Sequence, residues 1–125
     1  MIWNREQVAW VAGLIEGEGT IRIHKTSPNQ PRAKAIYAHP MVSVQMTDED
    51  VVRRAHEWTG LGHVLGPYNV PSRPGSKPIW MWTINKKDHA MTLIAMVWPY
   101  LGERRSEQAR RTLAAFRKGA HYVPD

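Results

Sequence analysis

The sequence predicts an α+β fold, in which two β-hairpins form one antiparallel sheet and helices cover one face of that sheet. Three observations predict this class. The 125 residues suit one ordinary domain, so we expect a single domain over residues 1–125. Apolar residues recur at helical spacing in some segments and alternate with polar residues in others. In chain order these segments read α-β-β-α-β-β-α-α, an αββαββα core followed by a C-terminal helix. This order leaves the second face of the sheet open to water or a ligand.

The first helix is expected to begin after Asn4 and to end at about Gly17. Asn4 and Gln7, three residues apart, can form a capping box, and Trp3 and Val8 occupy the positions of a hydrophobic staple. Apolar residues then recur every three or four positions. The start of this helix is therefore well specified by local sequence.

A first hairpin should follow. Residues 20–25 alternate apolar and polar side chains, residues 27–34 read as a loop, and residues 36–46 return as a strand. Pro40 requires an edge position or a bulge, because proline donates no hydrogen bond. Strand parity turns the isoleucines of the first strand and the valines of the second toward the helices. The open face then receives Thr20, Arg22, His24, Thr26, His39, Met41, Ser43 and Gln45.

The second half of the predicted core repeats this plan. Thr47 is expected to cap a helix over residues 48–59, and Gly60 to end it. Two strands follow over residues 62–68 and 79–84, joined by a segment rich in proline and serine. They complete the sheet.

Two helices close the chain. Asn85 and Asp88 are expected to cap a third helix that ends at Pro99. A fourth helix should run over residues 103–118, with Gly119 at its C-cap.

Composition restricts the function. Lys and Arg number 17 against 11 Asp and Glu, a net charge of +6 that suits a polyanionic partner, although such an excess can simply aid solubility. The absence of cysteine excludes disulfides and thiolate-bound zinc, and the six histidines lack zinc-ligand spacing. No apolar run is typical of a signal peptide or a membrane span. We therefore expect an intracellular protein that is neither secreted nor bound to a membrane.

The end of the first predicted helix contains the candidate residues for a functional site. Ala9, Gly13 and Gly17 are spaced by four residues and form one small-residue stripe. Glycine in a helix costs about 0.5–1 kcal/mol relative to alanine, which close packing of another backbone can offset. If the stripe pairs with a second copy of the chain about a two-fold axis, two Glu18 carboxylates meet.

Two acids, Glu16 and Glu18, end this helix, where the macrodipole disfavours anions by roughly 0.3–1 kcal/mol. Converging carboxylates repel unless a cation lies among them, and oxygen ligands suit Mg²⁺. The alternative is an ordinary helix C-terminus, at which Gly17 or Gly19 only turns the chain.

Residues 11–19, VAGLIEGEG, resemble the nine-residue signature of the LAGLIDADG homing endonucleases. Five positions are identical, and glutamates stand for the two acids: Ala12, Gly13, Leu14, Ile15 and Gly19, with Glu16 and Glu18. The order of elements also resembles that family, whose antiparallel sheet is saddle-like and binds DNA. The resemblance implies a sequence-specific, metal-dependent endonuclease that cleaves a long, nearly palindromic duplex. One motif per chain implies the homodimeric branch, encoded in an intron or a phage mobile element.

The resemblance also implies roles for individual residues. Glu18 would be catalytic and bind Mg²⁺ together with the Gly17 carbonyl. Asp48 would position water, and Arg104, or else Arg105, would complete the catalytic site. Mn²⁺ would substitute for Mg²⁺, Ca²⁺ would bind without supporting cleavage, and no small-molecule cofactor is implied. The dimer interface would comprise Ala9, Gly13, Leu14 and Gly17. The family usually has aspartate where this chain has Glu18. An acid at a helix start or an exposed arginine also needs no function.

We expect double-stranded DNA to lie on the open face and against both hairpin loops. Its candidate contacts are Arg22, His24, Lys25, Thr26, Arg32, Lys34, His39, Ser43, Gln45, Arg73 and Lys77. The alternative is an ordinary solvated strand face. Trp80 and Trp82 share one strand face and are expected in the core, although contact with DNA is open.

Two other functions stay open. A non-cleaving nucleic-acid-binding protein on the same scaffold, a maturase or a regulator, would bind in a salt-sensitive way without metal-dependent nicking. A protein-interaction domain would use the glycine stripe only as a dimer interface.

Overall fold

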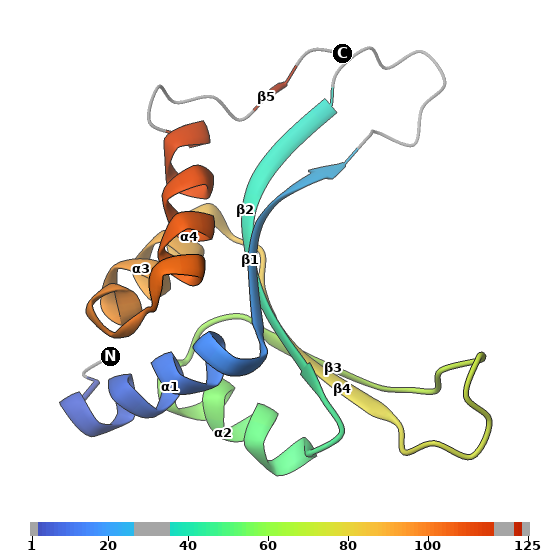
Figure 1. Cartoon of the computed structure of the whole chain (residues 1–125). Helices are drawn as coiled ribbons and strands as arrows, with labels where there is room; N and C mark the ends of the chain where they lie inside the picture. Colours follow the sequence, from blue (N-terminus) through green and yellow to red (C-terminus); the bar gives the residue numbers. More distant parts are fainter. Residues whose placement is uncertain (1–2, 27–35, 117–121, 124–125) are drawn as a thin grey trace.

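The computed structural model describes residues 3–26, 36–116 and 122–123. It confirms the α+β class. Figure 1 shows a bent sheet whose convex side is covered by helices, while the concave side carries none. The elements in chain order are α1 (Arg5–Glu18), β1 (Gly19–Thr26), β2 (Ile36–Met46), α2 (Glu49–Thr59), β3 (His63–Tyr68), β4 (Ile79–Ile84), α3 (Lys87–Val97), the 3-10 turn η1 (Trp98–Tyr100), α4 (Glu103–Phe116) and β5 (Tyr122–Val123).

The main strands form an antiparallel sheet in the order β1-β2-β4-β3. β2 is the long central strand, but its two neighbours pair with different parts of it. β4 pairs with Val42 to Met46, whereas Pro40 lies opposite Ile23 of β1 outside that ladder. Pro40 therefore occupies a local edge, as its missing N–H requires. The short β5, which the sequence did not predict, pairs with Ile36 and Tyr37.

The core lies between the convex face of the sheet and the helices. Parity correctly predicts the inward residues of the first hairpin, since Ile21, Val42 and Val44 are buried. Trp82 is fully buried and its indole N–H donates to the Leu61 carbonyl at 2.8 Å. The other large members of this cluster are Val11, Ile15, Val52, Ile84, Leu93, Ile94 and Val97. Trp80 and Trp82 are thus on the helix-covered side of the sheet, as expected.

The start of α1 agrees with the prediction from local sequence, whereas the N-caps of α2 and α3 differ from the predicted ones. The capping box forms, because the Gln7 N–H donates to Asn4 Oδ1 at 2.7 Å and the Gln7 side chain accepts from the Asn4 N–H. α2 begins one residue later than predicted, with Asp48 at the N-cap in place of Thr47. Gly60 ends α2 in the left-handed region, at φ 66°.

The predicted cap of α3 is wrong. Lys86 occupies the N-cap, while the Asn85 side chain accepts a hydrogen bond from the Thr83 hydroxyl at 3.1 Å and is not free to cap. The α-helix ends at Val97, and Pro99 lies in the 3-10 turn that follows. Such shifts of one or two residues are common at helix ends. Lys118 and Gly119, the predicted end of the last helix, lie outside the described residues. No helix of the described segments has the length and apolarity needed to cross a bilayer.

Candidate active site and nucleic-acid interface

Glu18 is the last residue of α1 and the next residue, Gly19, already begins β1. This loop-free junction requires glycine, since a Cβ on Gly19 would lie 2.7 Å from the Ile15 carbonyl oxygen. The Glu18 side chain is exposed, and it makes no hydrogen bond or ion pair with any described residue. Figure 1 shows the junction at which α1 runs directly into β1. The free Glu18 carboxylate belongs to the last residue before that junction.

Glu16, two residues earlier, accepts two hydrogen bonds from within the chain. Its carboxylate accepts the Gly102 N–H at 2.5 Å, and its carbonyl accepts from Arg105 Nε at 3.2 Å. Both donors precede or begin α4, so these bonds fix that helix against the end of α1. The Arg105 charge also compensates the negative end of the α1 dipole. Glu16 therefore connects the end of α1 to the start of α4.

The two candidate arginines differ in their surroundings. Arg105 is only 8% exposed and also donates through Nη1 to Gln108 Oε1 at 3.0 Å. Arg104 is exposed and has no partner among the described residues. A guanidinium must be free to meet a phosphate, so this arrangement favours Arg104 over Arg105.

Asp48 lies at the same end of the sheet as Glu18. Gly19 pairs with Val44, so the last residues of β2 run alongside the end of α1, and Asp48 follows two residues after Met46. The Asp48 side chain is exposed and makes no capping hydrogen bond. Its carboxylate is therefore available, although it is not bonded to either of the other two candidates.

The small-residue stripe on α1 is uncovered in the single chain. Ala9, Gly13 and Gly17 are exposed, and a Cβ added at either glycine would meet nothing within 4 Å. No part of the described chain uses the close approach that these glycines permit. Leu14 differs, because it is half-buried and packs against the core of its own chain.

No family model and no curated protein matches this sequence. Solved structures do match. The homing endonuclease I-CvuI in complex with DNA aligns at a TM-score of 0.73 and 18% identity, over 91% of this chain and 68% of that chain. The chain has the LAGLIDADG endonuclease fold.

Two further structures with this fold show the same likeness. The group I intron-encoded I-CeuI, complexed with DNA, aligns at a TM-score of 0.69 and 17% identity, over 97% of this chain and 60% of that chain. The LAGLIDADG endonuclease I-GzeII in complex with its DNA target aligns at a TM-score of 0.66 and 11% identity, over 94% of this chain and 36% of that chain. This chain thus spans about two thirds of some LAGLIDADG chains and about a third of others.

In the LAGLIDADG fold of this chain, the donors near Glu18 suit a hard cation only in part. The Glu18 carboxylate and the Gly17 carbonyl, which lies in the last helical turn and lacks an intrahelical partner, are both oxygen ligands that Mg²⁺ accepts. The Glu16 carbonyl is already bonded to Arg105. Across the described segments, no cluster of three or more His, Asp and Glu residues could hold a metal. Within one copy of the described chain, the Glu18 carboxylate and the Gly17 carbonyl are the oxygen atoms at this junction that a cation could use.

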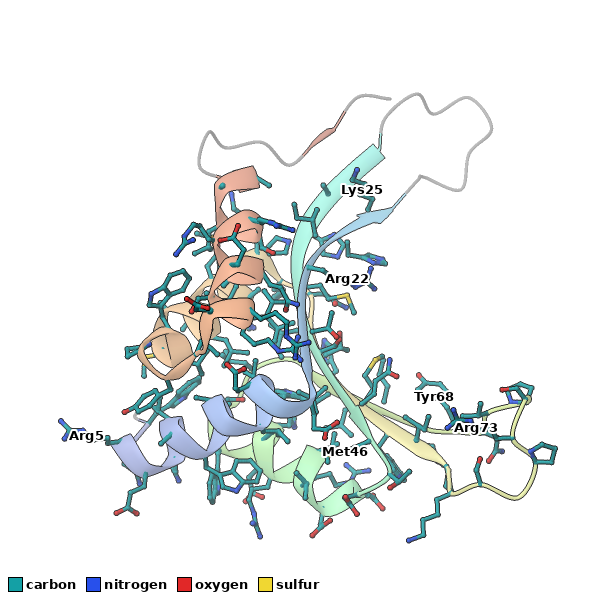
Figure 2. All side chains as sticks on the ribbon, in the orientation of Figure 1. Arg5, Arg22, Lys25, Met46, Tyr68 and Arg73 are labelled. Carbon is teal, nitrogen blue, oxygen red and sulfur yellow. The ribbon has the colours of Figure 1, made fainter. Side chains whose placement is uncertain are left out.

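The open face carries several of the predicted contacts. Arg22 and Gln45 are exposed, His24 and His39 are half-buried, and Arg73 and Lys77 are exposed in the β3–β4 loop. Figure 2 shows Arg22 on the concave side of β1 and Arg73 on the hairpin that extends β3 and β4.

Other predicted contacts are less available. Ser43 is only 7% exposed, because it lies between Thr20 and Thr83 on the neighbouring strands. Lys25 is exposed but shares its strand parity with Ile23, which assigns it to the helix-covered side. For Thr26 only the backbone is described, and Arg32 and Lys34 lie outside the described residues.

Two exposed apolar residues of β3 on the open face were not identified from the sequence. Leu65 lies opposite Met81 and is 40% exposed, and Tyr68 lies opposite Ile79 and is 48% exposed. Pairing with β4 places both on the open face, where Tyr68 is seen in Figure 2. The alternation of side chains along β3 and β4 could have placed both residues on the open face. The irregular register between Leu65 and Tyr68 interrupts that alternation, so the sequence did not show it clearly.

Proposed function

We propose that this chain is a sequence-specific, divalent-metal-dependent endonuclease of the homing type, which cleaves double-stranded DNA as a homodimer. The observation that carries the proposal is the free Glu18 carboxylate at the α1–β1 junction, next to a glycine stripe that the single chain leaves uncovered. I-CvuI, which shares the fold, is described with DNA in the presence of Mg and of Ca.

The proposed dimer rests on the uncovered stripe of α1. Ala9, Gly13 and Gly17 are exposed, and a Cβ at either glycine would meet nothing within 4 Å, so the single chain leaves space there for a second backbone. Packing two stripes about a two-fold axis would bring two Glu18 carboxylates together. A two-fold symmetric protein in turn favours a nearly palindromic target, because each copy reads one half of it.

Each candidate has a distinct task in this proposal. Glu18 and Gly17 would hold Mg²⁺, or Mn²⁺ in its place, which supplies a polarised phosphate and a more acidic bound water. Asp48 would orient water through its carboxylate. Arg104 would offset the charge that develops on the phosphate. Arg105 would keep the end of α1 in place.

The concave face would hold the duplex. Its β-ribbons match the width of a major groove, with Arg22 and Gln45 suited to guanine and adenine edges, while Arg73 and Lys77 would reach phosphates. Such targets lie inside cells, which agrees with a cysteine-free chain.

The test begins with selection of cleaved sites from a randomised duplex library, first with Mg²⁺ and then with Ca²⁺. Glu18→Gln keeps the shape of the side chain and removes its charge, so we expect duplex binding to persist and Mg²⁺-dependent double-strand cleavage to fall by about 100-fold or more. Glu6→Gln, an exposed carboxylate at the other end of the same helix, is the matched control and should cleave normally. Normal cleavage by Glu18→Gln would remove the proposed active site.

A second candidate is a non-cleaving nucleic-acid-binding protein on the same scaffold, such as a maturase or a regulator. The observation that favours it is the glutamate at both acidic positions of the motif, where the family usually has aspartate. It predicts that the wild-type chain binds duplex DNA or RNA with a strong salt dependence and shows no nicking with Mg²⁺ or Mn²⁺.

A further inference from the structure

Two histidines face each other across the first hairpin. His24 of β1 lies directly opposite His39 of β2, and their ring centroids are 5.1 Å apart with the planes inclined at 61°. Both side chains are half-buried, and strand parity places them on the concave face with Arg22. Both lie outside the nine-residue motif, and the proposed cleavage does not need them.

The pair contains an unsatisfied atom. Nδ1 of His24 is buried and has no hydrogen-bond partner among the described residues. A buried polar atom without a partner is rare in folded proteins and calls for a ligand, an ion or a water. The second ring is suited to a metal as well: desolvation, His24 and Arg22, in that order, lower the pKa of His39 below 6.5. The neutral form that metals bind is thereby favoured.

We propose that His24 and His39 together bind one transition-metal ion of the Zn²⁺ class on the concave face. Two imidazoles that share a tetrahedral ion at about 2.0–2.1 Å have ring centres about 5 Å apart, which is the spacing of this pair. Nitrogen ligands favour Cu²⁺, Ni²⁺ and Zn²⁺ and not Mg²⁺, so this site is chemically distinct from the oxygen ligands at Glu18.

The site has two protein ligands and an adverse charge beside it. Water or a nucleic-acid phosphate can fill the remaining positions, so the bound ion would add positive charge to the face that is proposed to hold DNA. Arg22 opposes an added cation. Binding should therefore be weaker than at a structural zinc site, which has four protein ligands.

The experiment is calorimetric titration of the full-length, chelator-treated chain with ZnCl₂ in the absence of DNA, so its outcome does not depend on cleavage or dimer function. We expect one Zn²⁺ per chain, and about tenfold or weaker binding in both His24→Gln and His39→Gln. The double variant should be no worse than the weaker single one, because both ligands serve one ion. Arg22→Gln should bind more tightly.

His63→Gln is the matched control, since His63 is exposed and pairing with Thr83 places it on the same face. It should bind Zn²⁺ as the wild type does, and far-UV circular dichroism should show every variant folded. In NMR spectra, Zn²⁺ should shift the imidazole signals of His24 and His39 and Mg²⁺ should shift neither. Wild-type Zn²⁺ affinity in either single variant, or no binding by the wild-type chain, would overturn the proposal.

Discussion

At the scale of single residues, neighbouring side chains of one type have separate roles. Glu16 and Glu18 share a motif, but hydrogen bonds to the start of α4 engage Glu16 and leave Glu18 free. Arg104 and Arg105 divide in the same way, because successive residues of a helix point about 100° apart. Burial therefore separates the structural member of each pair from the member that can act on a ligand.

Substitution of Arg105 should affect stability, whereas substitution of Arg104 should affect cleavage. Arg105→Ala leaves the Glu16 carbonyl without its donor, so we expect it to lower the free energy of unfolding by roughly 1–3 kcal/mol. Arg104→Ala should change stability by about 0.5 kcal/mol or less, and under the proposed function it should slow cleavage by about 100-fold. Urea unfolding measures the first effect and single-turnover cleavage the second. Equal destabilisation by both variants would contradict these assignments.

His39 predicts a pH dependence of stability. Desolvation, then His24 and Arg22, lower the pKa of its imidazole below 6.5 in the folded chain, so the unfolded chain takes up this proton at a higher pH. The contribution of His39 is therefore fully present above about pH 6.5, falls as the pH drops below it, and levels off below the folded pKa. His39→Gln should flatten that part of the profile, measured as urea midpoints between about pH 5 and 8. An unchanged profile would contradict the lowered pKa.

At the scale of elements, α1 has two different faces. Val8, Val11 and Ile15 enter the core, while Ala9, Gly13 and Gly17 face outward into space that the described chain does not fill. A helix that carries two interior glycines with no close neighbour is less stable than it could be. The proposed partner helix would account for this composition, because the described chain places nothing against either glycine.

Gly13→Leu tests that explanation. The added side chain meets nothing within the chain and improves helix propensity, so the isolated fold should keep its stability or gain up to about 1 kcal/mol. The dimer should weaken, because two backbones can no longer approach. Sedimentation over a range of concentrations measures the association, with Ala114→Leu, an exposed position on α4, as control. A Gly13→Leu chain that dimerises like the wild type would place the interface elsewhere.

At the scale of the whole molecule, one face of the sheet contributes to the core and the other is open for the proposed binding. The convex face buries Val42, Val44 and Trp82 under the helices, and the concave face carries no helix (Figure 1). Arg22 and Tyr68 lie on that concave face (Figure 2). An antiparallel sheet allows this division because its side chains alternate. The net charge of +6 favours a polyanionic partner, and the proposed function assigns that partner to the concave face.

Salt dependence tests which cations meet that partner. Arg73→Gln, at an exposed position of the β3–β4 loop that is proposed to reach a phosphate, should weaken duplex binding and reduce the slope of log affinity against log salt by about 0.9, the value for one phosphate contact. Arg110→Gln should leave the slope unchanged, since Arg110 lies on α4 in an ion pair with Glu107 at 2.6 Å. Binding isotherms between about 50 and 200 mM salt measure both. Equal slopes for Arg73→Gln and the wild type would remove Arg73 from the interface.

The sequence by itself determined the features that arise from local chemistry. The element order, the capping box at Asn4, the inward valines of β2 and the edge position of Pro40 follow from periodicity, side-chain hydrogen bonding and the missing proline N–H. The candidate acid, Glu18, was also identifiable, because the motif ends a helix directly before a strand.

Only the tertiary structure decided which candidates are free. Arg105 is engaged because α4 packs against the end of α1, Ser43 is shielded by residues of two neighbouring strands, and Asn85 is bonded to Thr83 instead of capping α3. The His24–His39 pair likewise exists only through the register of β1 and β2. These properties depend on atoms far apart in the chain, and local sequence carries little information about the distances between them.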